Sequence, residues 1–302
     1  MVHISYRIRI TVVTTQMVWF NRLQFFCHWS IINRIIDPTF TNKAIEFIER
    51  SRKRNPNQPF FVYLALSAPH APWLPPVFVQ GKSRAGPRGD QVVLVDWCVG
   101  QIVKALERMY LTDNTLFIAT SDNGPRRGVN GHKSAGNIRG YKSHTWEGGH
   151  RIPFIARWPG KIKPDTTSDE PICLTDLMAT CSAILGDKLP ENAGQDSYNI
   201  LPALPGEKLD KPIREAIVSH SVYGVFSIRQ GPWKLILENR DSGGWVRPGG
   251  SRPKPGSPGQ LYNLDDDPAE QNNLFDKHPA IVKRLTALLE RYKKQGRSAP
   301  ID

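Results

Sequence analysis

Two continuous apolar runs and one amphipathic segment dominate the pattern of hydrophobic and polar positions. Residues 59–66 form an apolar run of the kind found in buried strands of parallel sheets. Residues 91–110 place apolar side chains three and four positions apart, which predicts an amphipathic helix, and residues 115–120 form a second apolar run. Together they predict a β-α-β unit in which a right-handed crossover joins two parallel strands.

Weaker patterns before and after this unit predict further elements. Residues 41–50 have helical spacing, with Thr39 or Thr41 as the N-cap. A last amphipathic helix is predicted from Pro279 to the residue before Gly296. Short stretches divided by Gly and Pro predict strands over residues 216–219, 224–229, 233–238 and 261–264.

The first 35 residues follow neither pattern. The alternation over residues 6–10 predicts a short strand. Arginines interrupt every apolar stretch, so this segment has no run of the ~20 apolar residues that a membrane helix needs. It also lacks the succession of basic, apolar and small residues that marks a secretion signal. We expect no membrane span, and residues 1–35 stay unassigned.

Composition and charge narrow the class of protein. The 302 residues, with 39% hydrophobic and 23% charged side chains, are typical of a folded globular chain. Four cysteines without a C-x-x-C pair exclude a disulfide framework. The net charge of +12 is not concentrated in one stripe, and residues 59–200 carry 15 basic and 13 acidic side chains. We therefore expect no nucleic-acid partner.

Candidate catalytic and metal-binding residues follow the predicted strands. His70 lies in the loop after the first apolar run, and Asp122 and Asn123 follow the second. Because ligand sites of open α/β sheets form at the carboxyl ends of strands, we expect these residues on one edge of the sheet. Asp and Asn offer hard oxygen ligands suited to Ca²⁺ or Mg²⁺. Lys142, in the glycine-rich loop over residues 124–149, is a point charge suited to sulfate or phosphate oxygens.

Short motifs carry a resemblance to a known family. They are PFFVYLALSAPHAP, TSDNGP, RGYKSHTWEGGHRIP, FIARWPG, GPWKL and LYNLDDDPAE, at residues 59–72, 120–125, 139–153, 154–160, 231–235 and 261–270. Their order and spacing resemble the sulfatase family, arylsulfatase A-like enzymes in particular, over residues 36–295. The resemblance implies an α/β fold: an incomplete alkaline-phosphatase-like mixed sheet flanked by helices, with a smaller C-terminal antiparallel sheet plus a helix. It assigns residues 36–205 to the catalytic domain and residues 206–302 to the C-terminal subdomain.

The resemblance also implies an activity, the hydrolysis of sulfate esters with a divalent cation. By position, Asp122 and Asn123 match two ligands of the Ca²⁺ ion of sulfatases, with Mg²⁺ as an alternative. His70 matches the histidine that contacts the sulfate and assists protonation of the leaving group. Lys142 matches the lysine that holds the sulfate and stabilises charge on the bridging oxygen. The implied partner is an aryl or carbohydrate sulfate ester, and family members often act outside the cytoplasm.

One family motif is absent from the sequence. Sulfatases form their nucleophile from the cysteine of C-x-P-S-R, and Cys27-His28-Trp29-Ser30-Ile31 keeps only the Cys and the Ser. The paired N-terminal aspartates that complete the metal site are missing too. We therefore expect the C-terminal part of a sulfatase, without a nucleophile and with turnover absent or impaired. Two alternatives stay open: a non-catalytic fragment that binds sulfate esters, and a phosphate or phosphonate ester hydrolase of the alkaline phosphatase superfamily.

Overall fold

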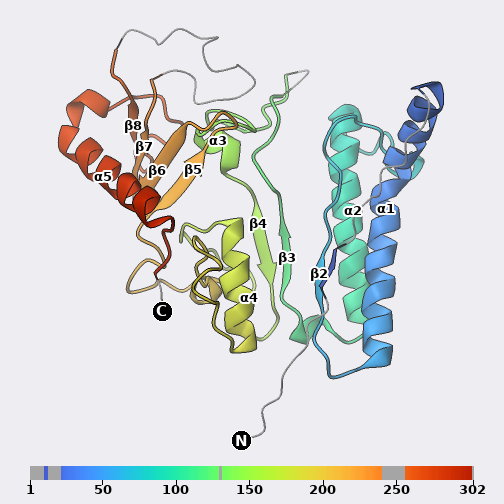
Figure 1. Cartoon of the computed structure of the whole chain (residues 1–302). Helices are drawn as coiled ribbons and strands as arrows, with labels where there is room; N and C mark the ends of the chain where they lie inside the picture. The colour runs from blue at the N-terminus through green and yellow to red at the C-terminus, as the bar shows by residue number, and fades with distance from the viewer. Residues whose placement is uncertain (1–9, 13–21, 129–130, 240–255, 301–302) are drawn as a thin grey trace, which may run out of the picture. The chain divides into compact units, whose positions relative to one another are not determined.

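The computed structural model describes residues 10–12, 22–128, 131–239 and 256–300. The chain forms two compact units, Met1–Thr115 and Leu116–Asp302, whose elements are labelled in Figure 1. The strand predicted over residues 6–10 lies, apart from Ile10, outside the described ranges. No helix in those ranges is long and apolar enough to cross a lipid bilayer.

The first unit consists of a two-stranded parallel sheet and two long helices. Strand β1 (Ile10–Val12) pairs with strand β2 (Phe61–Tyr63). Helix α1 (Arg22–Arg54) lies along helix α2 (Gly86–Arg108), as Figure 1 shows. The apolar side chains of α2 and of the segment before it form a buried cluster that contains Ala68, Val79, Leu94 and Cys98.

Helix α1 begins well before the predicted cap. Thr39 and Thr41 lie inside the helix, where their hydroxyls donate to the carbonyl oxygens of Ile35 (2.7 Å) and Asp37 (2.8 Å). The prediction of an N-cap at either threonine was wrong. A threonine hydroxyl can also be satisfied by the carbonyl four residues earlier, so the residue type alone did not distinguish a cap from a helix interior.

Helix α2 confirms the predicted amphipathic segment, although its apolar residues are not all buried. Leu94, Cys98 and Ala105 are fully buried, whereas Val92, an apolar residue of the same segment, is 54% exposed. Cys98 is a packing residue of the buried cluster. Burial raises the pKa of its thiol to about 11, so the group stays protonated and unreactive near neutral pH.

In the described part of the chain, the two apolar runs are not hydrogen-bonded to each other but have other partner strands. The partner of β2 is β1, whereas the second run, β3 (Phe117–Thr120), pairs antiparallel with β4 (Phe154–Arg157). In β2, Phe61 is 37% exposed and Tyr63 is 58% exposed, so this strand is not buried on both faces in the described structure. An apolar run indicates a strand, but it does not specify the partner strand.

The second unit combines the β3–β4 pair with a four-stranded antiparallel sheet in the order β5-β6-β7-β8. Helix α5 packs against β6 and β7 of this sheet. The four strands are Ile217–His220, Phe226–Gln230, Trp233–Ile236 and Gln260–Asn263. The helices α3, α4 and α5 are Glu147–His150, Leu177–Leu185 and Pro279–Gln295. The predicted C-terminal strands and the last helix are confirmed.

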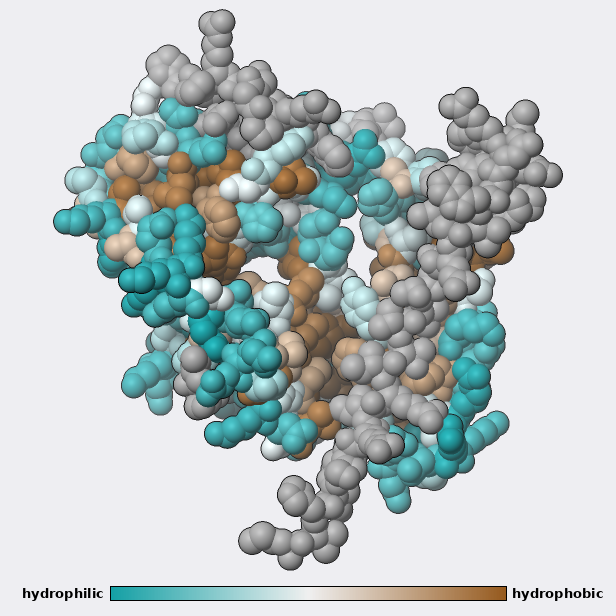
Figure 2. Space-filling model, in the orientation of Figure 1, coloured by the Kyte–Doolittle hydropathy of each residue, from teal (hydrophilic) through white to brown (hydrophobic). Residues whose placement is uncertain are grey.

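The core of the C-terminal sheet lies between its strands and α5. Ile228 and Leu235 are fully buried against Leu285 and Leu289 of the helix. Figure 2 shows hydrophilic side chains along the outer side of α5, with apolar side chains gathered toward the sheet. The helix ends before Gly296, whose φ of 65° lies in the left-handed region that favours glycine.

Candidate functional site

His70 lies in the loop that follows β2, and a carboxylate of helix α1 holds the start of that loop. Asp37 is 1% exposed and accepts hydrogen bonds from the backbone N–H of Ser67 (2.7 Å), from the Ser67 hydroxyl (3.0 Å) and from the backbone N–H of Ala68 (2.9 Å). His70 is exposed, and its Nδ1 lies 2.7 Å from the carbonyl oxygen of Ala71. A carbonyl only accepts, so Nδ1 carries a proton and Nε2 is the ring atom available for proton transfer. This loop belongs to the first unit, so its proximity to the other predicted site residues stays a prediction.

Asp122 and Asn123, together called the Asp-Asn pair, follow β3 in the second unit. Asp122 is exposed, and the side-chain amide of Asn123 donates to the carbonyl oxygen of Gly124 (3.0 Å), which leaves its Oδ1 for another partner. These oxygens suit a hard cation, and Ca²⁺ takes about six to eight oxygen ligands. The described ranges contain no group of three or more His, Cys, Asp or Glu side chains placed to hold a metal. The pair therefore fits such a cation in kind but does not complete its coordination within those ranges.

Lys142 lies in a segment that is hydrogen-bonded to the loop of the Asp-Asn pair. Its backbone N–H donates to the carbonyl oxygen of Pro125 (2.8 Å), and the N–H of Gly124 donates to the carbonyl oxygen of Gly149 (2.9 Å). Lys142 itself is half-buried. The structure thus brings the predicted anion-binding lysine and the predicted metal ligands into neighbouring segments of one unit.

Glycines make this close approach of the two segments possible. A Cβ on Gly124 would lie 2.0 Å from the carbonyl oxygen of Gly148, and a Cβ on Gly149 would lie 2.0 Å from that of His144. Both distances are far shorter than a van der Waals contact, and the atoms opposite are backbone atoms. Gly124 therefore accepts no side chain without a shift between the two segments, and Gly149 accepts none without a shift within the Lys142 segment itself.

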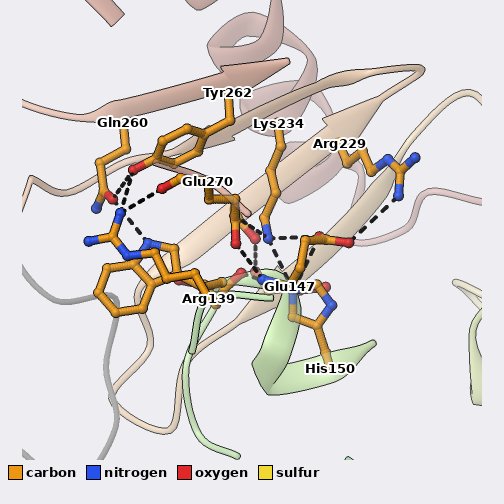
Figure 3. Close-up of polar contacts among 12 residues, drawn as sticks. Arg139, Glu147, His150, Arg229, Lys234, Gln260, Tyr262 and Glu270 are labelled. Atoms are coloured by element: carbon orange, nitrogen blue, oxygen red, sulfur yellow. Dashed lines mark hydrogen bonds and ion pairs between the residues drawn. The ribbon is translucent and has the colours of Figure 1, made fainter. Parts of the chain in front are cut away.

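A buried ionic cluster joins the same segment to the C-terminal sheet, as Figure 3 shows. The ammonium nitrogen of Lys234, on β7, lies 2.9 Å from Oε1 of Glu147 and 2.9 Å from Oε1 of Glu270. These three side chains are at most 4% exposed. Glu270 also accepts a hydrogen bond from the backbone N–H of Glu147 (2.6 Å). Nη1 of Arg229 lies 3.8 Å from Oε2 of Glu147, so a second cation faces this carboxylate.

Burial and neighbouring charges shift the pKa values of this cluster. Burial raises the pKa of Glu270 above its ordinary value. Burial acts in the same direction on Glu147, but the charge of Lys234 and its hydrogen bond to the carboxylate outweigh it and hold the Glu147 pKa below its ordinary value. The pKa of His150 is lowered to about 4, by burial and by the charge of Lys234. His150 is therefore neutral at pH 7, and its Nε2 donates to the carbonyl oxygen of Thr145 (2.9 Å).

Arg139 makes a second set of contacts between the Lys142 segment and the C-terminal sheet. Its guanidinium lies over the ring of Trp146, 3.9 Å from the ring centroid. Its Nη1 donates to the Tyr262 hydroxyl (3.1 Å) and to the carbonyl oxygen of Glu270 (2.8 Å). The indole N–H of Trp146 and the hydroxyl of Tyr262 both donate to Oε1 of Gln260 (3.1 and 2.7 Å). These contacts hold the segment of the predicted anion-binding lysine against β8.

The sequence singled out the motifs that contain this cluster but not the contacts between them. Glu147, Lys234 and Glu270 belong to three different motifs of the resemblance. One signal was present, since Lys234 stands between Trp233 and Leu235 in an apolar strand. A lysine buried in a strand needs a carboxylate partner, but the strand does not say where in the chain that partner lies.

Comparisons with known proteins identify the family. The family model described as "Sulfatase" matches residues 12–186. The N-acetylgalactosamine-6-O-sulfatase of Bacteroides thetaiotaomicron is 38% identical over 267 residues, which cover 84% of this chain and 50% of that protein. Arylsulfatase A of Bos taurus is 33% identical over 231 residues, which cover 72% of this chain and 45% of that protein. A solved structure from work on the metabolism of glycosaminoglycans by Bacteroides thetaiotaomicron has a TM-score of 0.74 and 35% identity, and the match covers 87% of this chain and 55% of that one.

The chain belongs to the sulfatase family. Its solved structural relatives are sulfatases, which confirms the expected alkaline-phosphatase-like α/β fold with a small antiparallel sheet. The family match begins at residue 12, inside the segment that the sequence left unassigned. The chain spans about half the length of the curated relatives it matches.

Proposed function

We propose that this chain supplies the sulfate-binding side of a sulfuric ester hydrolase that acts on sulfated carbohydrates. The observation that carries the proposal is the pair of backbone hydrogen bonds that holds the Lys142 segment to the loop of the Asp-Asn pair. A fixed positive charge beside oxygen ligands for a hard cation suits a tetrahedral anion such as sulfate. The sequence contains no C-x-P-S-R motif, so we propose that these residues bind the ester without completing a turnover.

Each predicted site residue has a role in this proposal. The Lys142 ammonium would hold the sulfate oxygens, the bridging oxygen of the ester among them. Nε2 of His70 would donate a hydrogen bond to the ester when the imidazole is protonated, because Nδ1 is already hydrogen-bonded to a carbonyl. Asp122 and Asn123 would provide two ligands of Ca²⁺ or Mg²⁺, which when bound supplies Lewis-acid polarisation of the sulfate.

The substrate class rests on the relatives. One acts by name on an N-acetylgalactosamine 6-sulfate, and the solved structure comes from work on glycosaminoglycans. Both favour a carbohydrate sulfate over an aryl sulfate for this chain. The two curated relatives described above are both named as sulfatases. Their names support a sulfate ester over a phosphate or phosphonate ester as the ligand.

Binding of N-acetylgalactosamine 6-sulfate to the purified full chain, measured by calorimetry with CaCl₂ present, tests the proposal. We expect it to bind at least ~10-fold more tightly than unsulfated N-acetylgalactosamine and than the 6-phosphate. The Lys142→Met variant should lose this preference, whereas Lys163→Met, at an exposed lysine of the same unit, should keep it. Equal binding of the sulfated and unsulfated sugars would overturn sulfate recognition. Release of inorganic sulfate that disappears in His70→Ala would overturn the absence of turnover.

A further inference from the structure

The loop between the Asp-Asn pair and Lys142 encloses a small hollow that the proposed sulfate binding does not use. Its volume is about 170 Å³, and its lining includes Arg127, His132, Lys133 and Tyr141. Tyr141 is the neighbour of Lys142 in the chain, so the hollow ends within one residue of the proposed sulfate-binding lysine. All of the lining residues belong to the second unit.

The charge of this loop is of one sign. Residues 124–146 contain five Lys and Arg side chains and no Asp or Glu. Arg139 donates a hydrogen bond to Tyr262 of β8. At the hollow, Lys133 is exposed and His132 is half-buried. Basic side chains around a concave surface with no acidic side chain in the same loop create a positive potential that attracts anions.

The hollow has walls that the chain itself holds in place. The Ser134 hydroxyl donates to the carbonyl oxygen of Arg126 (2.7 Å), and the N–H of Gly136 donates to the carbonyl oxygen of Lys133 (2.9 Å). A Cβ on Gly128 would lie 1.6 Å from the carbonyl oxygen of His132, so the two sides of the loop meet at that glycine. A positively charged hollow held by such contacts is partly organised before a ligand arrives.

The size of the hollow limits what it can hold. Pockets that enclose a whole small-molecule ligand measure about 300–1,000 Å³, and this hollow, at about 170 Å³, is smaller. It therefore suits one charged group better than a complete sugar substrate.

We propose that this hollow is a second anion subsite, for a sulfate or carboxylate group on the sugar next to the one that carries the scissile ester. This inference rests on the proposed function, because it places the scissile sulfate at Lys142. Lys133 and His132 would contact the second anion, and the ring of Tyr141 would lie along the sugar between the two charged groups. The chain would then select saccharides with negative charges on neighbouring sugars.

The test compares three ligands by calorimetry on the full chain. These are N-acetylgalactosamine 6-sulfate, the same sugar linked to a neutral hexose, and the same sugar linked to a hexuronate. We expect the hexuronate disaccharide to bind about 10-fold more tightly than the neutral one, with the advantage falling as salt is added. A fourth ligand, in which the neutral hexose carries a sulfate, distinguishes a preference for sulfate from one for carboxylate.

Variants assign that advantage to the hollow. The ratio of the two disaccharide affinities should fall toward one in the Lys133→Gln variant. It should fall further in the double variant that combines His132→Gln and Lys133→Gln. Lys163→Gln should keep the ratio of the parent protein, and circular dichroism checks that each variant is folded. A ratio of one in the parent protein, or an unchanged ratio in the double variant, would overturn the second subsite. If the monosulfated sugar fails to bind while the hexuronate disaccharide still binds in a Lys133-dependent way, the proposed function fails and the anion subsite stands.

Discussion

The ammonium nitrogen of Lys234 lies 2.9 Å from a carboxylate oxygen of Glu147, a residue 87 positions earlier in the chain. Both side chains are buried, and Glu270 contacts the same nitrogen from a third segment. Lys234, on β7, is thereby the shared cation of two carboxylates: Glu147 at the start of α3, and Glu270 in the loop after β8. The contact ties the segment that carries Lys142 to the C-terminal sheet.

Replacing Lys234 with methionine should destabilise the second unit strongly. The change leaves two buried carboxylates without their shared cation, and breaking a buried ion pair by removing one partner costs about 3–5 kcal/mol. Urea unfolding of the full chain measures the loss. Lys163→Met at an exposed position should change the free energy of unfolding by less than about 0.5 kcal/mol. Similar effects of the two substitutions would contradict a structural role for the cluster.

The stability of the second unit should rise with pH between about 4 and 6.5 because of His150. Its folded pKa is lowered to about 4, by burial first and by Lys234 second, whereas an unfolded chain titrates near ~6.5. In that window the unfolded chain binds the proton more readily, so the contribution is complete above pH ~6.5 and is lost as the pH falls to about 4. Since the side chain is 33% exposed, we expect a slope of about 1 kcal/mol per pH unit or less.

The variant His150→Gln isolates this effect from the carboxylates of the cluster. Its free energy of unfolding, measured in urea from pH 4 to 8, should depend less steeply on pH than that of the parent protein. The difference between the two curves should grow across the window and level off above pH ~6.5. Parallel curves would show that the imidazole does not titrate differently in the folded and unfolded chain.

A methyl group at Gly124 should disturb the loop of the Asp-Asn pair. The added Cβ would meet the carbonyl oxygen of Gly148 at 2.0 Å, and forcing atoms into a packed region costs about 1–3 kcal/mol. Gly100→Ala is the matched control, because Gly100 lies inside α2 with nothing within 4 Å of the added Cβ. That control should stabilise the first unit by about 0.4–1 kcal/mol. Thermal unfolding of both variants checks the opposite signs.

Removing the Asp37 carboxylate should loosen the loop of His70. Hydrogen bonds to a charged group contribute about 1.5–3 kcal/mol each, and Asp37 accepts from the N–H groups of Ser67 and Ala68. In Asp37→Ala these two amides should therefore exchange with solvent about 10- to 100-fold faster, as measured by NMR hydrogen exchange. The exposed Asp113→Ala substitution in the same unit should leave their exchange unchanged. Unchanged protection in Asp37→Ala would show that the backbone alone fixes the loop.

The C-terminal part of the fold could be predicted because its signals are local. Pro279 begins α5 and Gly296 follows its end, and the apolar spacing between them names the buried face. The strands of the small sheet are separated by Gly and Pro, so each could be recognised within a few residues. A local signal misled in the first unit, where Thr39 and Thr41 were interpreted as caps, because the same hydroxyl can bond within a helix.

The rest depends on contacts between distant parts of the chain. The partner of β3 is β4 instead of a parallel strand, and no residue of Phe117–Thr120 encodes that choice. The candidate site divides in the same way. Motif position alone was enough to name Lys142 and the Asp-Asn pair. The hydrogen bonds that place them side by side run between backbone groups, which every residue type carries.

The buried ion pair between Glu147 and Lys234 also affects how the chain would unfold. The predicted boundary between a catalytic part and a C-terminal subdomain falls after residue 205, between these two partners. A cut there would leave the buried Glu147 carboxylate on one fragment without its lysine, and Lys234 on the other fragment would keep only Glu270 as a partner. The two sides of that boundary should therefore melt in one cooperative transition, and the separated fragments should recover their folds only when they are mixed.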